Sequence, residues 1–126
     1  MYNIGLNKVI TLVRGDTFSY DYKINIGTNI DRNYYRMKDG DYLYFAICQP
    51  NQPFEEAVIG KRYGKSDCRE EGEGEYIYSI APIHLSSDDT ENLTEGKYYY
   101  TIKLAKKTTD GYDVITTQPK TLFFLV

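Results

Sequence analysis

The chain has 126 residues, of which 41% are hydrophobic and 26% are charged, and its formal net charge is −3. This composition excludes a mainly disordered chain, and the absence of a basic block argues against nucleic-acid binding. The first residues lack the basic stretch and apolar run of a secretory signal, and the longest apolar runs are too short to span a bilayer. We therefore expect one globular domain over residues 1–126, with no nucleic-acid and no membrane partner.

Alternation of apolar and polar residues predicts strands near the beginning of the chain. It is clearest over residues 17–26, where every second residue is aromatic or aliphatic. Residues 8–13 predict an earlier strand, and Arg14-Gly15-Asp16 lies between the two. This tripeptide also spells an integrin-recognition sequence, but Gly15 and Asp16 stand where two strands need a turn. We therefore assign Gly15 and Asp16 a structural role.

The middle of the chain predicts a central strand followed by weaker ones. Residues 42–49 are apolar on both faces, which is typical of a strand near the centre of a sheet. A weaker strand is expected over residues 56–63 and another over residues 75–80. The intervening segment contains the densest charge of the chain, so residues 64–74 are predicted to form a solvated loop.

The last third predicts one short helical turn and a run of strands. Residues 85–93 fit one or two helical turns, because Ser86 or Ser87 can cap the helix and the acidic residues that follow are favourable near its positive end. Strands are expected over residues 97–105, 112–117 and 120–126, with Asp110-Gly111 as a hairpin turn. About eight short strands with hardly any helical periodicity predict an all-β, antiparallel sandwich or barrel.

Candidate catalytic and metal-binding residues are few. His84 is the only histidine, and no nucleophile-elbow pattern surrounds the nearest serines, Ser79, Ser86 and Ser87. Turn-forming aspartates do not match the twelve-residue calcium loop; they are Asp39, Asp41, Asp88 and Asp89. We therefore expect no catalytic residue, no cofactor and no metal, and a protein that is not an enzyme.

The two cysteines are predicted to be free thiols. Cys48 lies in an apolar strand and Cys68 in a charged segment, so they do not fit a disulfide. With one histidine and no Cys-x-x-Cys pair, they also do not form a zinc site of standard spacing.

The fourteen tyrosines are expected mainly in the core. They fall on the inward-looking face of the alternating strands, which favours core packing over stacking on nucleobases. A line of exposed tyrosines would instead stack on sugar rings. A carbohydrate-binding or adhesion module is therefore the alternative function.

Two stretches resemble a known group of viral domains. They are residues 9–18, a strand that runs into Arg-Gly-Asp, and residues 85–104, a short acidic turn followed by Gly-Lys-Tyr-Tyr-Tyr. Both are similar to small β-sandwich domains of tailed bacteriophages, including the amino-terminal domain of baseplate upper proteins; residues 27–74 match no such motif. The resemblance implies a non-enzymatic virion protein of the tail, baseplate or head-to-tail region. Such a protein would be assembled in the bacterial host cytoplasm and would dock on other virion proteins or on itself.

The second stretch is also similar to the corner of immunoglobulin-type domains. In that corner Gly96 permits the bend, and the Tyr98 hydroxyl bonds back to the backbone across it. Tyr100 then takes the inward position where antibody domains place a disulfide cysteine. The expected architecture is therefore an immunoglobulin-like sandwich of about eight antiparallel strands, with one short helical turn near residues 86–93.

The carboxyl-terminal strand supplies a candidate interface. Terminal strands are often edge strands, and an edge offers unpaired backbone groups to a partner. Phe123 and Leu125 point to one side of this strand, and the opposite side is also apolar. One side is expected in the core, and the other is expected to be covered by a second sheet, a neighbouring loop or a partner. Phe123 and Leu125 are assigned to a possible interface.

Overall fold

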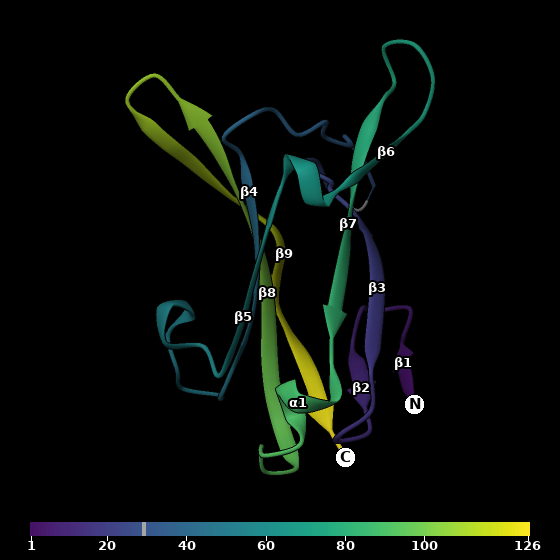
Figure 1. Ribbon diagram of the computed structural model, residues 1–126, viewed down its shortest axis with the longest axis vertical. Helices are drawn as coiled ribbons and strands as arrows, with labels where there is room; N and C mark the ends of the chain where they lie inside the picture. The colour runs from purple at the N-terminus through teal and green to yellow at the C-terminus, as the bar shows by residue number, and fades with distance from the viewer. Residues whose placement is uncertain (29) are drawn as a thin grey trace.

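Two β-sheets face each other in the computed structural model, which describes residues 1–28 and 30–126 (Figure 1). The six-stranded sheet has the order β1 (Tyr2–Ile4), β2 (Ile10–Leu12), β9 (Gly111–Leu125), β8 (Gly96–Thr108), β4 (Tyr42–Cys48) and β5 (Ile59–Gly64). The three-stranded sheet has the order β3 (Phe18–Lys23), β7 (Tyr78–Leu85) and β6 (Arg69–Glu71). Paired strands are antiparallel, except that β2 runs parallel to β9.

Three short helical segments lie between the strands. The 3₁₀ turns η1 (Phe54–Glu56) and η2 (Lys65–Asp67) flank β5, and α1 (Ser87–Thr90) follows β7. The helical turn predicted near residues 86–93 is therefore present, although it is shorter. Ser86 begins it, since its backbone N–H donates to a carboxylate oxygen of Asp89 at 2.8 Å.

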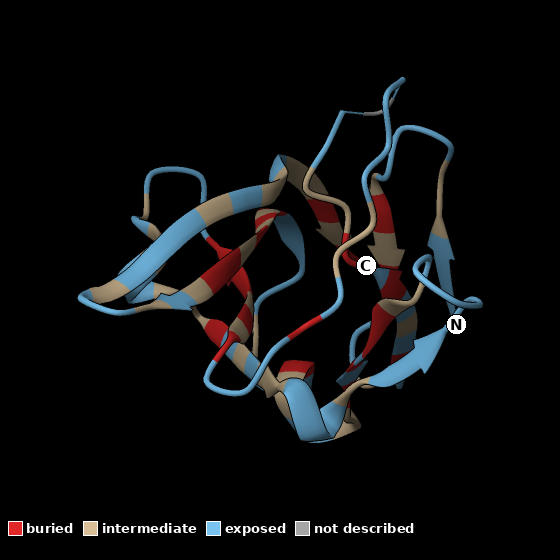
Figure 2. Ribbon diagram, turned by 90° about the horizontal axis from the view of Figure 1, so that it is seen from above, coloured by how far each residue is buried: buried red, intermediate tan, exposed pale blue. Residues whose placement is uncertain are grey.

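The core lies between the two sheets and is formed by one side of each main strand (Figure 2). Successive residues of a strand point to opposite faces, so every second side chain of β4 and β8 is inward. These inward side chains are 0–5% exposed: Leu43, Phe45, Ile47, Tyr98, Tyr100, Ile102 and Leu104. The three-stranded sheet contributes its own inward row to the same cluster: Phe18, Tyr22, Ala81, Ile83 and Leu85.

The turn before β3 and the corner before β8 have the predicted conformations. Gly15 has φ +85°, in the left-handed region that favours glycine, and its N–H donates to Oγ1 of Thr90 at 2.9 Å. At the corner, Gly96 has φ +151°, and the Tyr98 hydroxyl donates to the carbonyl oxygen of Thr94 at 2.6 Å. The predicted hydrogen bond of Tyr98 is therefore confirmed.

Two other predicted roles concern Asp16 and Tyr100. The N–H of Asp16 donates to the carbonyl oxygen of Val13 at 3.0 Å and closes the turn between β2 and β3. Tyr100 is 0% exposed, and its hydroxyl donates to the carbonyl oxygen of Lys8. Burial raises the pKa of Tyr100, so this phenol stays neutral and can donate.

The carboxyl-terminal strand differs from its prediction. Residues 112–117 and 120–126 belong to one strand, β9, and the register shifts beside Pro119, which has no N–H to offer its neighbour. Over residues 123–125, β9 lies between β2 and β8, so this end of the strand is not at the edge of the sheet. Phe123 and Leu125 are each 1% exposed and belong to the core, so the interface predicted at these two side chains is wrong.

The segment predicted as a loop contains β6, which pairs with β7. With β6 and the short β1, the described residues form nine strands rather than about eight. The extra strands have little buried apolar surface, so no alternation marks them in the sequence.

Hydrogen bonds to the Asp41 side chain link the long β8–β9 hairpin to the segment that precedes β4. Its side chain is buried, and one carboxylate oxygen accepts hydrogen bonds from the Tyr35 hydroxyl (2.6 Å) and the Lys38 N–H (2.9 Å). The other oxygen accepts from the Lys107 N–H at 2.8 Å. Burial alone would raise the pKa of Asp41, but these hydrogen bonds together hold it below its usual value.

Candidate docking face

The outward side of the six-stranded sheet carries aromatic and basic side chains in alternating rows. Cross-strand partners share a face, and Tyr44 of β4 is paired with Arg62 of β5 and with Lys103 of β8. Leu43 and Phe45, the neighbours of Tyr44, are completely buried, so the Tyr44 row points away from the core. In this outward row, an aromatic ring on β4 therefore lies between a cation on β5 and a cation on β8.

The basic groups on this side lie over aromatic rings. Lys103 Nζ is 4.4 Å from the centre of the Phe54 ring, and the Arg62 guanidinium is 4.7 Å from that of Tyr42. Three more cations repeat the arrangement along the sheet: Lys120 and Lys97 over Tyr99 at 4.6 and 5.7 Å, and Lys107 over Tyr112 at 5.0 Å. Such contacts stabilise by about 0.5–1 kcal/mol each at exposed sites and hold the charges in fixed places.

We call this surface the docking face: Arg62, Lys97, Lys103, Lys107 and Lys120, with Tyr42, Tyr44, Tyr99, Tyr112 and Phe54. None of its five cations pairs with a carboxylate within 4.0 Å among the residues that the structure describes. The whole chain has a net charge of −3. The docking face is therefore a basic region on an acidic protein.

The outward side of the three-stranded sheet has a different chemistry. There Arg69 pairs with Asp21 at 3.3 Å, and Lys23 lies over the Tyr34 and Tyr78 rings. His84 lies opposite Ser19, with Ser19 Oγ 3.2 Å from His84 Nδ1, and both side chains are exposed. The histidine thus forms a cross-strand pair with a serine that the sequence did not single out, in the open on a sheet surface.

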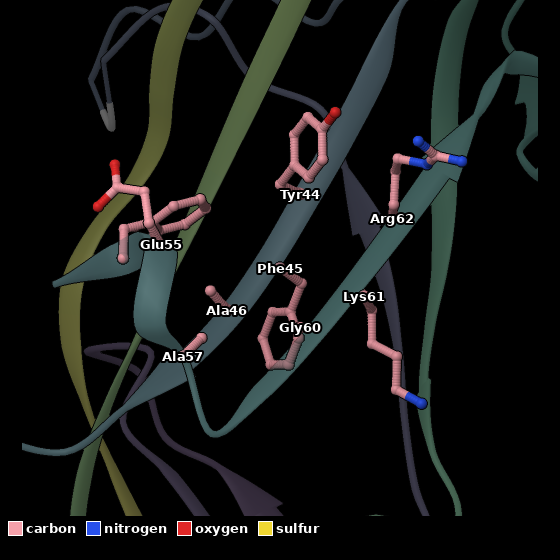
Figure 3. A pocket seen from close by; sticks show the side chains of 9 residues that line it. Tyr44, Phe45, Ala46, Glu55, Ala57, Gly60, Lys61 and Arg62 are labelled. Atoms are coloured by element: carbon pink, nitrogen blue, oxygen red, sulfur yellow. The ribbon is translucent and has the colours of Figure 1, made fainter. Parts of the chain in front are cut away.

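A hollow of about 370 Å³ opens on the docking face between β4, β5 and η1 (Figure 3). Its floor is formed by small residues, because Ala46 of β4 is paired with Gly60 of β5, and Ala57 lies beside them. Larger side chains surround this floor: Tyr44, Phe54, Arg62 and Glu55. The hollow exists because a row of small residues adjoins the row that carries Tyr44 and Arg62.

The segment η1, which forms one wall of the hollow, is held close to the end of β4 by two contacts. Cys48 Sγ lies 3.6 Å from the carbonyl oxygen of Pro53, immediately before η1, and the Gln49 N–H donates to Gln52 Oε1 at 3.1 Å. Burial raises the pKa of the Cys48 thiol, which favours the protonated form that can donate to Pro53. Phe54 and Glu55 are thereby held at the rim of the hollow.

Two of the four aspartates considered as metal ligands, Asp41 and Asp89, have close structural partners. Asp89 accepts from Lys61 Nζ at 3.0 Å and caps α1, and Asp41 is engaged by the three donors described above. No group of three or more potential metal-binding side chains occurs in residues 1–28 and 30–126. Within the same ranges, no helix has the length and apolar character needed to cross a membrane.

Sequence reasoning placed the tyrosines on the inward side, which holds for only some of them. Tyr22, Tyr98 and Tyr100 are buried in the core as predicted. Tyr44 is half-buried on the docking face, so the inward expectation is wrong for it, whereas Tyr99 lies on the side opposite Tyr98 and Tyr100, as the alternation of residues 97–104 predicts. The sequence shows that residues 42–49 are apolar on both faces, and the strand register identifies the row with Tyr44 as the outward one.

Comparison with known proteins gives no match: no family model, no curated protein and no solved structure is similar to this chain. Its function is therefore inferred from its own residues.

Proposed function

We propose that this protein is a non-enzymatic docking domain, a structural or adaptor component of a phage tail, baseplate or head-to-tail region that binds other virion proteins. The observation that supports docking is the face of aromatic rings and of cations that have no carboxylate partner in the described part of the chain, on the six-stranded sheet. The assignment to a virion follows from the resemblance of residues 9–18 and 85–104 to small β-sandwich domains of tailed phages.

The composition of the docking face favours a protein partner. Its tyrosines, Phe54 and Arg62 are of types enriched at the centres of protein interfaces, whereas its four lysines are of a type more common at the rim or on free surface. Five cations that pair with no carboxylate of residues 1–28 and 30–126 would also speed the approach of an acidic surface and orient it.

We further propose that the two sheets form an immunoglobulin-like sandwich. Three adjacent strands, β3, β7 and β6, have the sequential order of strands B, E and D, and β9, β8, β4 and β5 have that of strands G, F, C and C′. The corner hydrogen bond of Tyr98 also supports this arrangement. The attachment of β1 and β2 beside β9 departs from the constant-type pattern, in which the first strand pairs in the other sheet.

A carbohydrate-binding module is the second candidate, and the geometry of the rings argues against it. Stacking on sugars needs two or three coplanar rings with open faces. Tyr42 and Tyr44 are tilted by 49° with their centres 6.3 Å apart. Lysine or arginine groups cover faces of Tyr42, Tyr99, Tyr112 and Phe54.

Protein analysis of purified virus particles tests the virion assignment. Particles of the virus that encodes the chain are expected to contain it in a fixed copy number after density-gradient purification. Detection of the chain in the infected-cell lysate, with none in the particles, would contradict the assignment.

A further inference from the structure

The hollow on the docking face has an apolar floor and charged flanks. In the row that contains the floor, Gly60, Ala46 and Thr101 are cross-strand neighbours, whereas the adjacent row contains Arg62, Tyr44 and Lys103. A side chain that enters between Tyr44 and Phe54 would thus contact rings and small aliphatic groups. Its backbone would lie near the basic ends of Arg62 and Lys103.

The size of the hollow limits what can enter. Its volume of about 370 Å³ lies at the lower end of the roughly 300–1,000 Å³ usual for ligand pockets. This is space for one large side chain and its immediate surroundings, and an extended glycan would project beyond it.

We propose that the hollow is the specificity pocket of the docking face and receives one large apolar side chain from an acidic segment of the partner, whose carboxylates pair with Arg62 and Lys103. This inference rests on the proposed docking function and names its partner chemistry. An arginine can bind a carboxylate through two parallel hydrogen bonds, which fixes the register of the segment relative to the hollow.

Charge decides between an acidic peptide and other occupants. The cations are unpaired within the described part of the chain, so an acidic segment gains attraction without breaking an existing ion pair. Glu55, on the rim, is a carboxylate that would repel an acidic partner, but Arg62 and Lys103 outnumber it. Single-stranded nucleic acid would need open ring faces for base stacking, and Lys103 and Arg62 cover faces of Phe54 and Tyr42.

The probe is a nine-residue capped peptide with a central phenylalanine and four alternating aspartates and glutamates on each side. Titration into the isotopically labelled full chain, followed by amide NMR shifts at low salt, should perturb Ala46, Gly60 and Arg62. A peptide with serine in place of phenylalanine should bind at least tenfold more weakly, which corresponds to about 1.4 kcal/mol.

Gly60→Val is the variant that blocks the hollow. Gly60 has negative φ, and an added Cβ would meet no atom within 4 Å, so a β-branched residue fits the strand and fills the space. This variant should lower the affinity for the phenylalanine peptide about tenfold and leave the affinity for the serine peptide unchanged. Arg62→Gln should lower the affinity for both peptides, and Glu55→Gln should raise it for both.

Lys23→Gln is the matched control, since Lys23 lies over the Tyr34 and Tyr78 rings outside the docking face. It should change neither affinity. Thermal unfolding of each variant shows whether it is folded. If Gly60→Val is not folded, the Arg62→Gln result still provides a valid test.

The outcomes separate this inference from the docking function. If both peptides bind the face equally and Gly60→Val has no effect, the pocket assignment is wrong and the docking face stands. If neither peptide perturbs the face while maltoheptaose or a thymidine dodecamer does, both the pocket and the protein-docking function are wrong.

Discussion

Replacing Asp41 with asparagine tests how the β8–β9 hairpin is held. Asparagine retains one carbonyl oxygen, which can keep the bonds from the Tyr35 hydroxyl and the Lys38 N–H. Its amide group then faces the Lys107 N–H, so two donors meet and a buried hydrogen bond is lost. Hydrogen bonds to charged groups contribute about 1.5–3 kcal/mol, and we expect the free energy of unfolding to fall by that amount.

The effect of this substitution should depend on pH. The pKa of Asp41 is lower in the folded chain than its usual value of 3.8. A depressed carboxyl pKa stabilises the folded state above the unfolded pKa, and that contribution disappears as pH falls through the folded pKa. The free energies of unfolding of the parent and Asp41→Asn should therefore differ most at neutral pH, and this difference should shrink below about pH 4.

Urea unfolding at a series of pH values measures both effects. For slopes of roughly 1–3 kcal/mol per molar urea, the neutral-pH midpoint should fall by about 1 M. Asp39→Asn is the matched control, because its side chain is 97% exposed and pairs only distantly with Lys65, at 3.8 Å. The reasoning is refuted if the free energy of unfolding of Asp41→Asn lies within about 0.5 kcal/mol of that of the parent at neutral pH, or if the difference between the two does not depend on pH.

Four further predictions concern the corner, the thiols and the core. Tyr98→Phe should lower the free energy of unfolding by about 0.5–1.5 kcal/mol, and Tyr99→Phe on the docking face should not; equal effects would argue against the corner bond. Burial raises the pKa of Cys68 to about 11, so iodoacetamide should modify it slowly in the folded chain, and rapid labelling at neutral pH would contradict its burial. Cys48 and Cys68 are free, so a reducing agent should leave the thermal midpoint unchanged, whereas a drop would indicate a disulfide. Phe123→Ala should cost about 3–5 kcal/mol in urea unfolding, and a cost below about 1 kcal/mol would contradict its place in the core.

The sequence predicts strands well where one side is buried and the other is not. The residues around Phe18 and Tyr22 alternate strictly, because β3 has one face in the core and the other in solvent. The corner at Gly96 and Tyr98 was also predictable, since its hydrogen bond joins residues only four positions apart.

Strand order and the strand β6 could not be predicted locally. β6 is exposed at every residue, and Arg36 and Glu70 add an ion pair at 2.7 Å, so its signal is backbone pairing with β7 rather than alternation. The central place of β9 results from parallel pairing with β2, more than a hundred residues earlier in the chain. The sequence pattern shows two apolar sides of this strand but not which one is inward: Phe123 and Leu125 lie on the core side, and Leu122 and Phe124 are half-buried on the outward side.

Part of the docking face could be predicted from the sequence. The alternation of Tyr42, Tyr44 and Ala46 with buried neighbours indicates two apolar sides, and one of them must face outward. The hollow requires the register that places Gly60 beside Ala46, and this depends on the three-dimensional pairing of β4 with β5.

Site-specific photo-crosslinking tests the docking function most directly. A photoreactive amino acid is introduced at Tyr44 on the docking face, and separately at Pro82 on the outward side of β7, in the chain assembled in its native particle. We predict a discrete covalent adduct with one neighbouring protein from position 44 and none from position 82, and loss of that adduct when Arg62 and Lys103 are both changed to glutamate. Adducts from position 82 alone, or an adduct from position 44 that survives the double charge reversal, would contradict docking through this face.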